Sequence, residues 1–309
     1  MQQPKVFITI LVYNNYKDTK ECLQSLANIT YRNYQVILVD NGSTDGSVRK
    51  LQQEYPALNY IFNKNNLGFA GGVNEGIQYS MGIKADYILL LNNDVIVDKE
   101  FLNPLVATAE KNSCIGIVGS KIYYYGNPKT LNFAGGKINL WKGLAPHIGS
   151  GELDTGQYEN PTEEDFQDGC SILIKKDVIN KIGLFDKTFF LYSEEVDFCC
   201  RAKKAGFKII YVPQSKVWHK ISVTAGGRES LISIYHGTKS RLIFMRKNSQ
   251  IYHWFVFLPY VTYYSCRKII RWLIQYKFSP EFTKRLKAIT NAFKDGLACH
   301  FCDENQKED

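Results

Sequence analysis

Short apolar runs alternate with amphipathic segments along the first 120 residues of the chain. The apolar runs have the length of buried strands and fall at residues 6–12, 34–39, 60–62, 87–91 and 115–118. Between them, residues 17–27 and 101–110 repeat apolar side chains at helical spacing. Because strands that alternate with helices form parallel sheets covered on both faces, this pattern predicts an α/β fold.

The pattern changes beyond the last of these runs. Residues 123–165 are rich in Gly, Asn, Pro and Tyr and have weak periodicity, so we expect an excursion from the sheet. Long excursions beside a site commonly hold a second substrate. Regular structure is expected again at residues 170–174, followed by a short helix that ends near Ile182.

One predicted strand runs directly into a polar corner. Residues 87–91 are followed by Asn92, Asn93 and Asp94. Open α/β sheets bind ligands at the carboxyl ends of their strands, and a carboxylate there suits Mg²⁺ or Mn²⁺ better than zinc. The alternative is an ordinary turn, because Asn and Asp favour turns through their own backbone hydrogen bonds.

A second predicted strand ends in the same way, at Asp40. A carboxylate at this place can accept a hydrogen bond from the N3–H of a uracil or thymine ring, and Asn41 and Ser43 offer short-range donors. The Asn-Gly turn and the capping of the following helix account for the rest of the loop. They do not account for Asp40 itself.

A glycine-rich bend at residues 65–74 opens the next predicted helix, which has Val73, Ile77 and Met81 on one face. Glycines let backbone N–H groups approach a ligand closely, and the positive end of the helix dipole suits a diphosphate or a ribose. The bend lacks the Gly-Lys-Ser/Thr of a Walker loop, and its spacing is not that of the dinucleotide fingerprint. Glycine-rich loops are common, so the bend has weight only beside the two polar strand ends.

A later helix begins with clustered acids after residues 189–192, which include Phe189, Phe190 and Tyr192. Glu194, Glu195 and Asp197 in a first turn complement the helix dipole, and Asp197 with Arg201 forms an ordinary i,i+4 pair. However, two adjacent carboxylates beside aromatic side chains raise each other's pKa, as a general base requires. Further on, a strand-like piece ends at His219, and a lone histidine is more often structural than a ligand.

Charge is unevenly distributed along the 309 residues. The formal net charge is +8, and residues 226–302 hold 13 Lys or Arg but only 3 Asp or Glu, whereas the front of the chain is near neutral. With 45% hydrophobic residues, the chain can bury one large core and a smaller appendage. We therefore expect a large domain at residues 1–225 and a basic module at residues 226–309.

Cysteine usage indicates reduced thiols rather than disulfides. Most of the eight cysteines are scattered among apolar neighbours in a chain too large to need covalent staples. Cys299 and Cys302 form a lone Cys-x-x-Cys, for which zinc would need two more ligands nearby. No signal peptide precedes the first apolar run, so we expect the chain to stay in the cytoplasm.

Four motifs stand in the order of a known enzyme family. They are residues 39–46 (Val-Asp-Asn-Gly-Ser-Thr-Asp-Gly), 66–72 (Asn-Leu-Gly-Phe-Ala-Gly-Gly), 91–94 (Leu-Asn-Asn-Asp) and 190–197 (Phe-Leu-Tyr-Ser-Glu-Glu-Val-Asp). On these motifs the chain resembles, over about residues 5–247, the family 2 inverting glycosyltransferases and their rhamnosyltransferase-like branch. The resemblance implies a GT-A fold, with a Rossmann-like, mostly parallel sheet and flanking helices. After residue 225 we expect, from the residues themselves, a helical and membrane-associating extension. The nucleotide-sugar half would span about residues 1–120 and the acceptor half about residues 121–225.

The resemblance also implies a donor site and a metal site. The nucleotide-sugar donor would be bound by Tyr13, Asn14, Asp40, Asn41, Ser43, Asn66, Gly68, Gly71, Gly72, Asn74, Asn92 and Asn93. A Mg²⁺ or Mn²⁺ ion would be held by Asp94, with His219 as a second ligand. The metal corner of this family often reads Asp-x-Asp, and Asn92 replaces the first acid here, so the ion would depend on Asp94, the diphosphate and His219.

Glu195 occupies the position of the family's catalytic base, with Glu194 and Asp197 beside it. The family pair is usually Glu-Asp, so Glu195 has one methylene more than expected and a different reach. The base would take a proton from an acceptor hydroxyl, which attacks the anomeric carbon opposite the leaving diphosphate and inverts its configuration. Acceptor contacts would come from Asp168, Gly169, Tyr192 and Arg201.

Rhamnose from dTDP-rhamnose is the first expectation for the donor, and a UDP-hexose or UDP-galactofuranose transferase is the alternative. The acceptor would be a hydroxyl of a glycan or a lipid-diphosphate-linked glycan in cell-surface polysaccharide synthesis. A sugar-1-phosphate nucleotidyltransferase would need a glycine-rich basic loop after the first strand, where this chain has residues 12–16. A non-catalytic scaffold that only binds nucleotide sugar would not need the acids at positions 94 and 195.

The basic module carries an uncharged aromatic stretch. Residues 251–266 hold no Asp, Glu, Lys or Arg, and Arg267, Lys268 and Arg271 follow. The stretch is short for a membrane span and contains Pro259, whereas its Tyr and Trp residues are typical of a membrane interface. We expect peripheral contact with the inner, cytoplasmic leaflet, where a lipid-linked acceptor would lie. The alternative is a helical subdomain packed on the catalytic core or on a second copy in a homodimer. Nucleic acid is a poor partner, because no binding motif appears.

Overall fold

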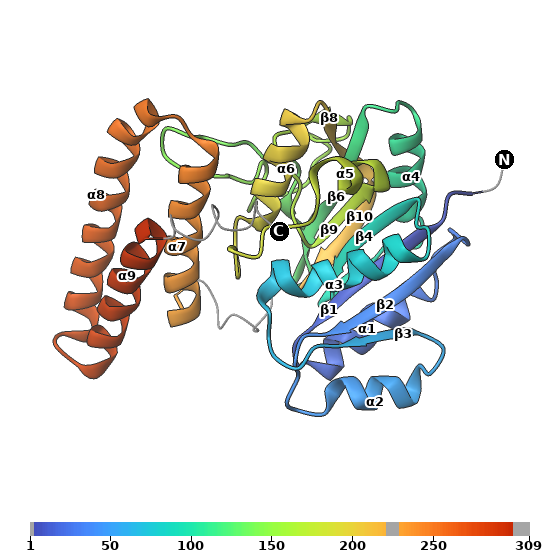
Figure 1. Ribbon diagram of the computed structural model, residues 1–309, viewed down its shortest axis with the longest axis horizontal. Coiled ribbons are helices and arrows are strands. Elements are labelled where there is room, and N and C mark those ends of the chain that lie inside the picture. The colour runs from blue at the N-terminus through green and yellow to red at the C-terminus, as the bar shows by residue number, and fades with distance from the viewer. Residues whose placement is uncertain (1–2, 221–228, 299–309) are drawn as a thin grey trace, which may run out of the picture. The chain divides into compact units, whose positions relative to one another are not determined.

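The computed structural model describes residues 3–220 and 229–298 (Figure 1). These residues form two units with separate sets of internal contacts. We call residues 3–137, 146–188 and 194–220 the sheet unit, and residues 138–145, 189–193 and 229–298 the helical unit. The helical unit therefore includes two short segments that lie before the C-terminal module in the sequence.

One mixed sheet of ten strands forms the centre of the sheet unit, with the order β3-β2-β1-β4-β9-β6-β10-β5 and with β7 and β8 paired to β6 and β10. The strands are β1 (Val6–Val12), β2 (Tyr34–Asp40), β3 (Asn59–Phe62), β4 (Tyr87–Asn92), β5 (Val95–Val97), β6 (Ile115–Tyr124), β7 (Asn127–Phe133), β8 (Thr162–Glu163), β9 (Ser171–Lys175) and β10 (Lys208–His219). Strands β1, β2, β3 and β4 are parallel to one another, and β6 and β10 run the same way. Strands β9 and β5 run in the opposite direction. The predicted α/β sheet with flanking helices is confirmed.

The helices of the sheet unit follow the crossover rule for parallel strands. They are α1 (Tyr16–Leu26), α2 (Ser47–Glu54), α3 (Gly68–Gly82), α4 (Leu102–Glu110), α5 (Lys176–Ile182) and α6 (Glu194–Lys204). Right-handed connections place α1 and α2 on one face of the parallel strands and α3 on the other, in front of β1 and β4 in Figure 1. The predicted alternation of strands and helices is therefore present in space.

Helix α3 lies very close to β1. A Cβ added at Gly72 would lie 2.4 Å from Cδ1 of Leu11, and one added at Gly76 would lie 2.3 Å from Cγ2 of Thr9. Both glycines are required because a side chain at either position would push the helix off the strand. This close packing fixes the N-terminus of α3 at the carboxyl edge of the sheet.

The helical unit is built on α7 (Leu231–Asn248), α8 (Ile251–Tyr276) and α9 (Pro280–Ala298). Helix α9 packs against both α7 and α8. Their shared core contains Ile234, Trp272, Phe282 and Ile289. Within the described ranges, every helix falls short of the length and apolarity that a bilayer crossing demands.

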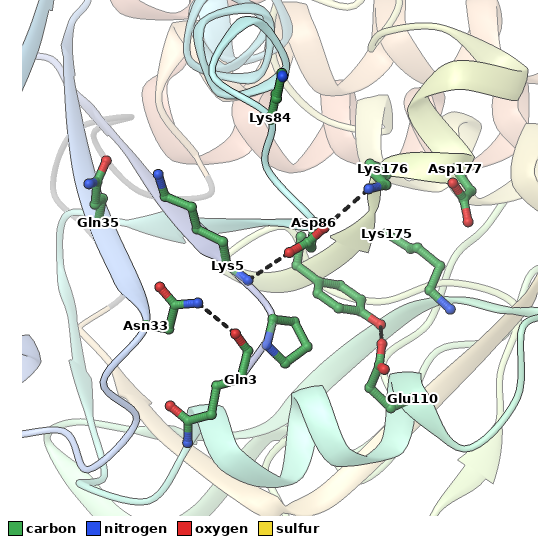
Figure 2. A pocket seen from close by; sticks show the side chains of 12 residues that line it. Gln3, Lys5, Asn33, Gln35, Lys84, Asp86, Glu110, Lys175, Lys176 and Asp177 are labelled. Atoms are coloured by element: carbon green, nitrogen blue, oxygen red, sulfur yellow. Dashed lines mark hydrogen bonds and ion pairs between the residues drawn. The ribbon is translucent and has the colours of Figure 1, made fainter. Parts of the chain in front are cut away.

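The described cysteines form no disulfides, and a cavity opens at the opposite edge of the sheet. The six cysteines within residues 3–220 and 229–298 are free thiols, and Cys299 and Cys302 lie outside the described residues. A cavity of about 710 Å³ opens where β1 and β4 begin (Figure 2). There Asp86 accepts hydrogen bonds from the backbone N–H of Lys5 at 2.9 Å and from Nζ of Lys176 at 3.1 Å. None of the predicted site residues lines this cavity, because they lie at the carboxyl edge.

Candidate active site

The loop after β1 is tied to the loop after β2. The backbone N–H of Asn14 donates to Oγ of Ser43 at 2.8 Å, and Oδ1 of Asn14 accepts from the backbone N–H of Thr44 at 2.9 Å. Asn14 has a φ of 61°, in the left-handed region that Asn tolerates better than most residues. Asn14 and Ser43 thus hold the two loops together, and half-buried Tyr13 directly follows β1 beside them.

Asp40 retains an oxygen that can accept a ligand. Its Oδ1 accepts the backbone N–H of Ser43 at 2.8 Å, which closes the turn directly after β2. Asp40 lies opposite Val12 in the parallel pairing of β1 and β2, so both strand ends meet at the same place. This arrangement orients the carboxylate and leaves its second oxygen for a donor group.

Asn41 organises the glycine-rich bend from inside. Its Nδ2 donates to Oδ1 of Asn66 at 2.9 Å and to the carbonyl of Gly68 at 3.0 Å, while its Oδ1 accepts the backbone N–H of Leu67 at 3.1 Å. Asn66 also accepts the backbone N–H of Gly68 at 2.9 Å. Because Asn41 is buried and its side chain is occupied, it positions the bend rather than reaching a ligand directly.

Two further residues assigned to the donor site serve the packing of α3. Asn74 is fully buried, and its side chain donates to the carbonyl of Phe185 at 2.8 Å and accepts the Phe185 N–H at 3.0 Å. A Cβ at Gly71 would lie 2.8 Å from Cβ of Leu67. Gly71, Gly72 and Asn74 therefore face protein and hold α3 in place.

Asp94 and His219 meet because their strands are in register. Asp94 directly precedes β5, and His219 at the end of β10 pairs with Val95 of β5. Oδ1 of Asp94 lies 3.2 Å from Nε2 of His219, and Nδ2 of Asn92 lies 3.5 Å from the same nitrogen. Burial lowers the pKa of His219, but the hydrogen bond and charge of Asp94, together with the charge of Asp168, outweigh it and raise that pKa.

This pair has unused ligand atoms. Asp94 is only 2% exposed. Its Oδ2 atom and Nδ1 of His219 are buried and have no hydrogen-bond partner within the described residues. Orphaned buried polar atoms of this kind require a partner. A carboxylate and an imidazole fit Mg²⁺ or Mn²⁺ as a partial ligand set. Within residues 3–220 and 229–298, no group of three or more His, Cys, Asp or Glu side chains is suited to a metal.

Asn93 and Lys220 fix the surroundings of the metal corner. Nδ2 of Asn93 donates to Oγ1 of Thr19 at 2.9 Å, which ties the corner to α1. The backbone N–H of Lys220 donates to the carbonyl of Asp94 at 3.0 Å, and its Nζ lies 2.6 Å from Oδ1 of Asp18. Sequence reasoning missed Lys220, because only the folded chain brings it to Asp94 and Asp18.

Glu194 and Glu195 begin α6 in a poorly solvated environment. Burial and the charge of Asp168 raise the pKa of Glu195 to about 7. Burial and the charge of Glu195 hold the pKa of Glu194 well above its usual range, and Oε2 of Glu194 is buried without a partner in the described residues. Burial therefore favours the protonated form of both carboxyl groups, and with its pKa of about 7 Glu195 is divided between its acid and base forms at neutral pH.

The turn at Asp168 and Gly169 links these groups. The charge of Asp168 acts on both Glu195 and His219. A Cβ at Gly169 would lie 3.7 Å from Cβ of Glu195 and 3.5 Å from the ring of Phe69 at the start of α3. The first turn of α3, the start of α6 and the metal corner thus border one turn of the chain.

His147 was not among the predicted site residues. Its Nε2 lies 3.6 Å from Oδ2 of Asp168, and its ring packs edge-on against Phe133 at 4.9 Å between centroids. The residue comes from the predicted excursion at residues 123–165, and no spacing rule links it to Asp168. The weak periodicity of the excursion concealed it.

Asp197, Arg201 and Tyr192 lie in different settings from Glu195. Nε of Arg201 donates to Oδ2 of Asp197 at 2.8 Å, and its other nitrogens donate to the carbonyls of Ile182 and Leu184, both at 2.9 Å. The predicted i,i+4 pair is therefore present, and Arg201 also holds the backbone at residues 182–184. Tyr192 belongs to the helical unit, where its hydroxyl lies 2.9 Å from Oγ of Ser233.

Comparisons with known proteins agree on one family. The model described as "Glycosyl transferase family 2" matches residues 7–183. The chain is 26% identical over 255 residues to a low-salt glycan biosynthesis hexosyltransferase of Haloferax volcanii, covering 78% of this chain and 75% of that protein. It is also 26% identical over 260 residues to the N-acetylglucosaminyl-diphospho-decaprenol L-rhamnosyltransferase of Mycobacterium tuberculosis, covering 77% and 83%. It is 24% identical to the rhamnosyltransferase WbbL of Escherichia coli, covering 69% and 83%.

Solved structures share the fold. GalNAc-T7 with UDP, GalNAc and Mn²⁺ superposes with a TM-score of 0.63 at 17% identity, over 77% of this chain and 47% of that chain. A mannosyltransferase from Pyrobaculum calidifontis in complex with GDP-Man and Mn²⁺ superposes with a TM-score of 0.59 at 11% identity, over 97% and 88%. These likenesses confirm the predicted GT-A fold.

Proposed function

Because the chain belongs to glycosyl transferase family 2 and is a glycosyltransferase of its rhamnosyltransferase-like branch, we propose that it transfers a sugar from a nucleoside diphosphate donor to a hydroxyl with inversion. The observation that carries this proposal is the turn at Asp168 and Gly169. Its charge acts on Glu195 and His219, and its backbone lies beside Phe69 at the start of α3. A base, a metal corner and a helix N-terminus around one turn are what an inverting displacement needs.

The donor would lie along the carboxyl edge of β1, β2 and β4. The second oxygen of Asp40 is available for the N3–H of uracil or thymine, and the N-terminus of α3 is suited to the diphosphate. Relatives named rhamnosyltransferases favour rhamnose from dTDP-rhamnose as the first choice. A relative named a hexosyltransferase, and the UDP in one structural neighbour, keep a UDP-hexose or UDP-galactofuranose as the alternative.

Asp94 and His219 would hold a Mg²⁺ or Mn²⁺ ion through Oδ2 and an imidazole nitrogen, and both neighbouring structures named above contain Mn²⁺. When bound, such an ion neutralises negative charge on a departing diphosphate. Asn92 is placed to steer the imidazole, because its Nδ2 lies 3.5 Å from Nε2 of His219. Lys220 and Asn93 keep the corner rigid.

Glu195 would act as the general base. Its raised pKa of about 7 places it near the operating pH, where a carboxylate accepts a hydroxyl proton most effectively. The acceptor oxygen then attacks the anomeric carbon from the face opposite the diphosphate, the bond to the diphosphate breaks, and the proton remains on Glu195.

A screen of donors tests this proposal. Purified protein is incubated with UDP-, dTDP- and GDP-sugars and Mg²⁺ or Mn²⁺, and free nucleoside diphosphate is measured with and without glycan acceptors. We expect one donor to release nucleoside diphosphate, and NMR of the product to show the inverted anomer. Retained configuration, or release that does not change in the Glu195→Gln variant, would refute the mechanism.

We further propose that α8 places the enzyme on the cytoplasmic face of an anionic membrane, where a lipid-diphosphate-linked acceptor lies. One face of α8 exposes a stripe with spacings of three and four, formed by Tyr252, Val256, Pro259, Tyr263, Cys266, Ile270 and Ile274. Ile274 in this stripe is 76% exposed, and Phe255, which directly precedes Val256 of the stripe, is 78% exposed. Exposed apolar area of this extent marks an interaction surface.

Charge favours a bilayer over a second copy of the chain. Helix α8 contains no Asp or Glu, Arg267 and Arg271 are exposed on it, and Lys277 is exposed directly after its end. Anionic lipid attracts such a helix, whereas a homodimer through this face would bring like charges together. A homodimer is therefore the alternative outcome of the test.

Vesicle co-sedimentation separates these outcomes. We expect binding to vesicles of phosphatidylglycerol and phosphatidylcholine but not to phosphatidylcholine alone, and loss of binding in the double variant Phe255→Ser with Ile274→Ser. Leu153→Ser is the matched control, because Leu153 is 57% exposed on the sheet unit. A dimer in solution that the double variant abolishes, without vesicle binding by the parent, would overturn the membrane proposal.

A further inference from the structure

The residues directly before the proposed base belong to the helical unit. Residues 189–193 group with α7, α8 and α9, and the next residue in the chain is Glu194 at the start of α6. This five-residue segment is thus joined directly to the first residue of α6. Any group that holds the segment also constrains the carboxylates that follow it.

Helix α7 holds the segment at three successive residues. Oγ of Ser240, which is 1% exposed, donates to the carbonyl of Leu191 at 2.8 Å. The ring of Phe190 stacks on His236 with centroids 4.7 Å apart and an interplanar angle of 22°. The hydroxyl of Tyr192 lies 2.9 Å from Oγ of Ser233.

The absence of a side chain at Gly237 lets the segment lie against α7. A Cβ at this position would lie 3.8 Å from Cδ2 of Tyr192, in ordinary van der Waals contact. A larger side chain on the same bond would extend into the Tyr192 ring. The four positions on α7 thus form one continuous support for residues 190–192.

The supported backbone is in a conformation that it would not adopt without support. Tyr192 and Ser193 have φ angles of 71° and 68°, in the left-handed region that non-glycine residues rarely occupy. Such conformations persist where the surroundings over-determine them, and they cluster at functional sites. Two in succession reverse the chain immediately before Glu194.

Helix α7 is in turn fixed by α9. Nη1 of Arg246 donates to the carbonyl of Leu297 at 2.7 Å, and a Cβ at Gly296 would lie 2.9 Å from Cβ of Leu242. Ile234 of α7 shares the core of Phe282 and Ile289. The support under residues 190–192 is therefore rigid rather than a single loose contact.

We propose that Ser240, His236 and Ser233 of α7 are positioning residues for the general base, acting through the backbone of residues 190–193. This inference rests on the proposed function of Glu195. It assigns to the C-terminal helices a role in catalysis that is separate from membrane contact. Misplacement of a catalytic group by about 1 Å costs on the order of 100-fold in rate, so the support has a measurable consequence.

Variants of α7 test the proposal with a soluble acceptor, so that membrane binding plays no part. We expect Ser240→Ala to lower kcat by about 10-fold to 100-fold while the KM for the donor and the affinity for the free nucleoside diphosphate stay unchanged. His236→Ala should lower kcat, and His236→Phe should restore most of it by renewing the stack on Phe190. Ser265→Ala is the matched control, because Ser265 is a buried serine of α8 rather than one of the α7 positions that support residues 190–192.

A double-mutant cycle distinguishes positioning from general damage. If Ser240 acts through the base, Ser240→Ala should add little to the loss already caused by Glu195→Gln, because effects of groups that act as a unit are not additive. Full additivity, or unchanged kcat in Ser240→Ala with an intact melting temperature, would overturn the inference.

Further readouts keep the outcomes separate. Should Ser240→Ala fail to fold, the comparison of His236→Ala with His236→Phe decides, and equal kcat in those two folded variants counts against the proposal. An unmodified enzyme that releases no nucleoside diphosphate from any donor would refute the proposed function instead.

Discussion

The metal corner is made by neighbouring strands, whereas the start of α6 depends on contacts distant in sequence. Asp94 lies in the short turn between β4 and β5, and the β5–β10 register brings His219 to it. Glu195 owes its raised pKa to burial and to Asp168, and its backbone enters α6 from a segment that α7 holds. The first site is therefore expected to tolerate changes elsewhere in the fold, and the second is expected to respond to them.

The same contrast separates two kinds of polar residue along the carboxyl edge. Asn41 and Asn74 have side chains fully engaged by the protein, while Asp94, His219 and Glu194 keep buried atoms without partners. Engaged groups stabilise the fold, and unpaired buried groups reduce stability unless a ligand completes them. The unpaired atoms thus mark where substrate and metal are expected.

Removal of the base gives the largest expected effect. Glu195→Gln should lower kcat by about 10²-fold to 10⁴-fold, because an amide of similar shape cannot accept the acceptor proton. Stopped assays of nucleoside diphosphate release measure it, with Glu163→Gln on the edge strand β8 as the control. A loss of kcat below 10-fold would show that Glu195 is not the general base.

Neutralising the metal corner should have the next largest effect. Asp94→Asn is expected to lower kcat/KM by about 10²-fold to 10³-fold, the range for losing one electrostatic stabiliser of developing charge. Isothermal titration with Mn²⁺ and nucleoside diphosphate gives an independent readout, in which the variant should lose metal affinity. Chelation of the parent enzyme should reproduce the kinetic defect, and an Mn²⁺ affinity equal to the parent's would contradict the assignment.

The strand-end part of this site was predictable because its signals are local. An apolar run followed by a polar acid, as before Asp40 and Asp94, predicts both a strand and the residue at its carboxyl end. The topology that brings β10 beside β5 is not local, so only family resemblance indicated His219. Roles for Gly71, Gly72 and Asn74 as ligand contacts could not be separated from packing roles, because glycine-rich helix starts serve both.

The acceptor side was less predictable. Asp168 was proposed without its effect on Glu195, and His147 was absent, since neither lies at a fixed spacing from α6. Residues 138–145 and 189–193 belong to the helical unit. No periodicity in the sequence predicts this. Such features arise from long-range packing, about which the local sequence pattern carries no information.

A residue engaged by the protein should affect stability and leave chemistry intact. Asn74→Ala removes both hydrogen bonds to the backbone of Phe185 and should destabilise the fold by about 1–3 kcal/mol. Urea unfolding measures this loss, and Gln78→Ala on the exposed side of α3 is the control. The kcat of the folded fraction should match the parent, and a selective rise in donor KM would instead indicate ligand contact.

The smallest expected effect is a shift in pH dependence. Glu195 must be deprotonated to accept a proton, so with its pKa near 7 the value of kcat/KM should rise with pH and level off above about 7.

Asp168 contributes to this raised pKa because its negative charge disfavours a second one. Asp168→Asn should therefore move the acidic limb to lower pH, so that the variant at pH 6 keeps a larger share of its own maximum than the parent keeps. Asp177→Asn, on the opposite edge of the sheet, should leave the limb in place. An unchanged midpoint in Asp168→Asn would show that burial alone sets the pKa of Glu195, and that the turn at Asp168 does not couple the two ends of the site.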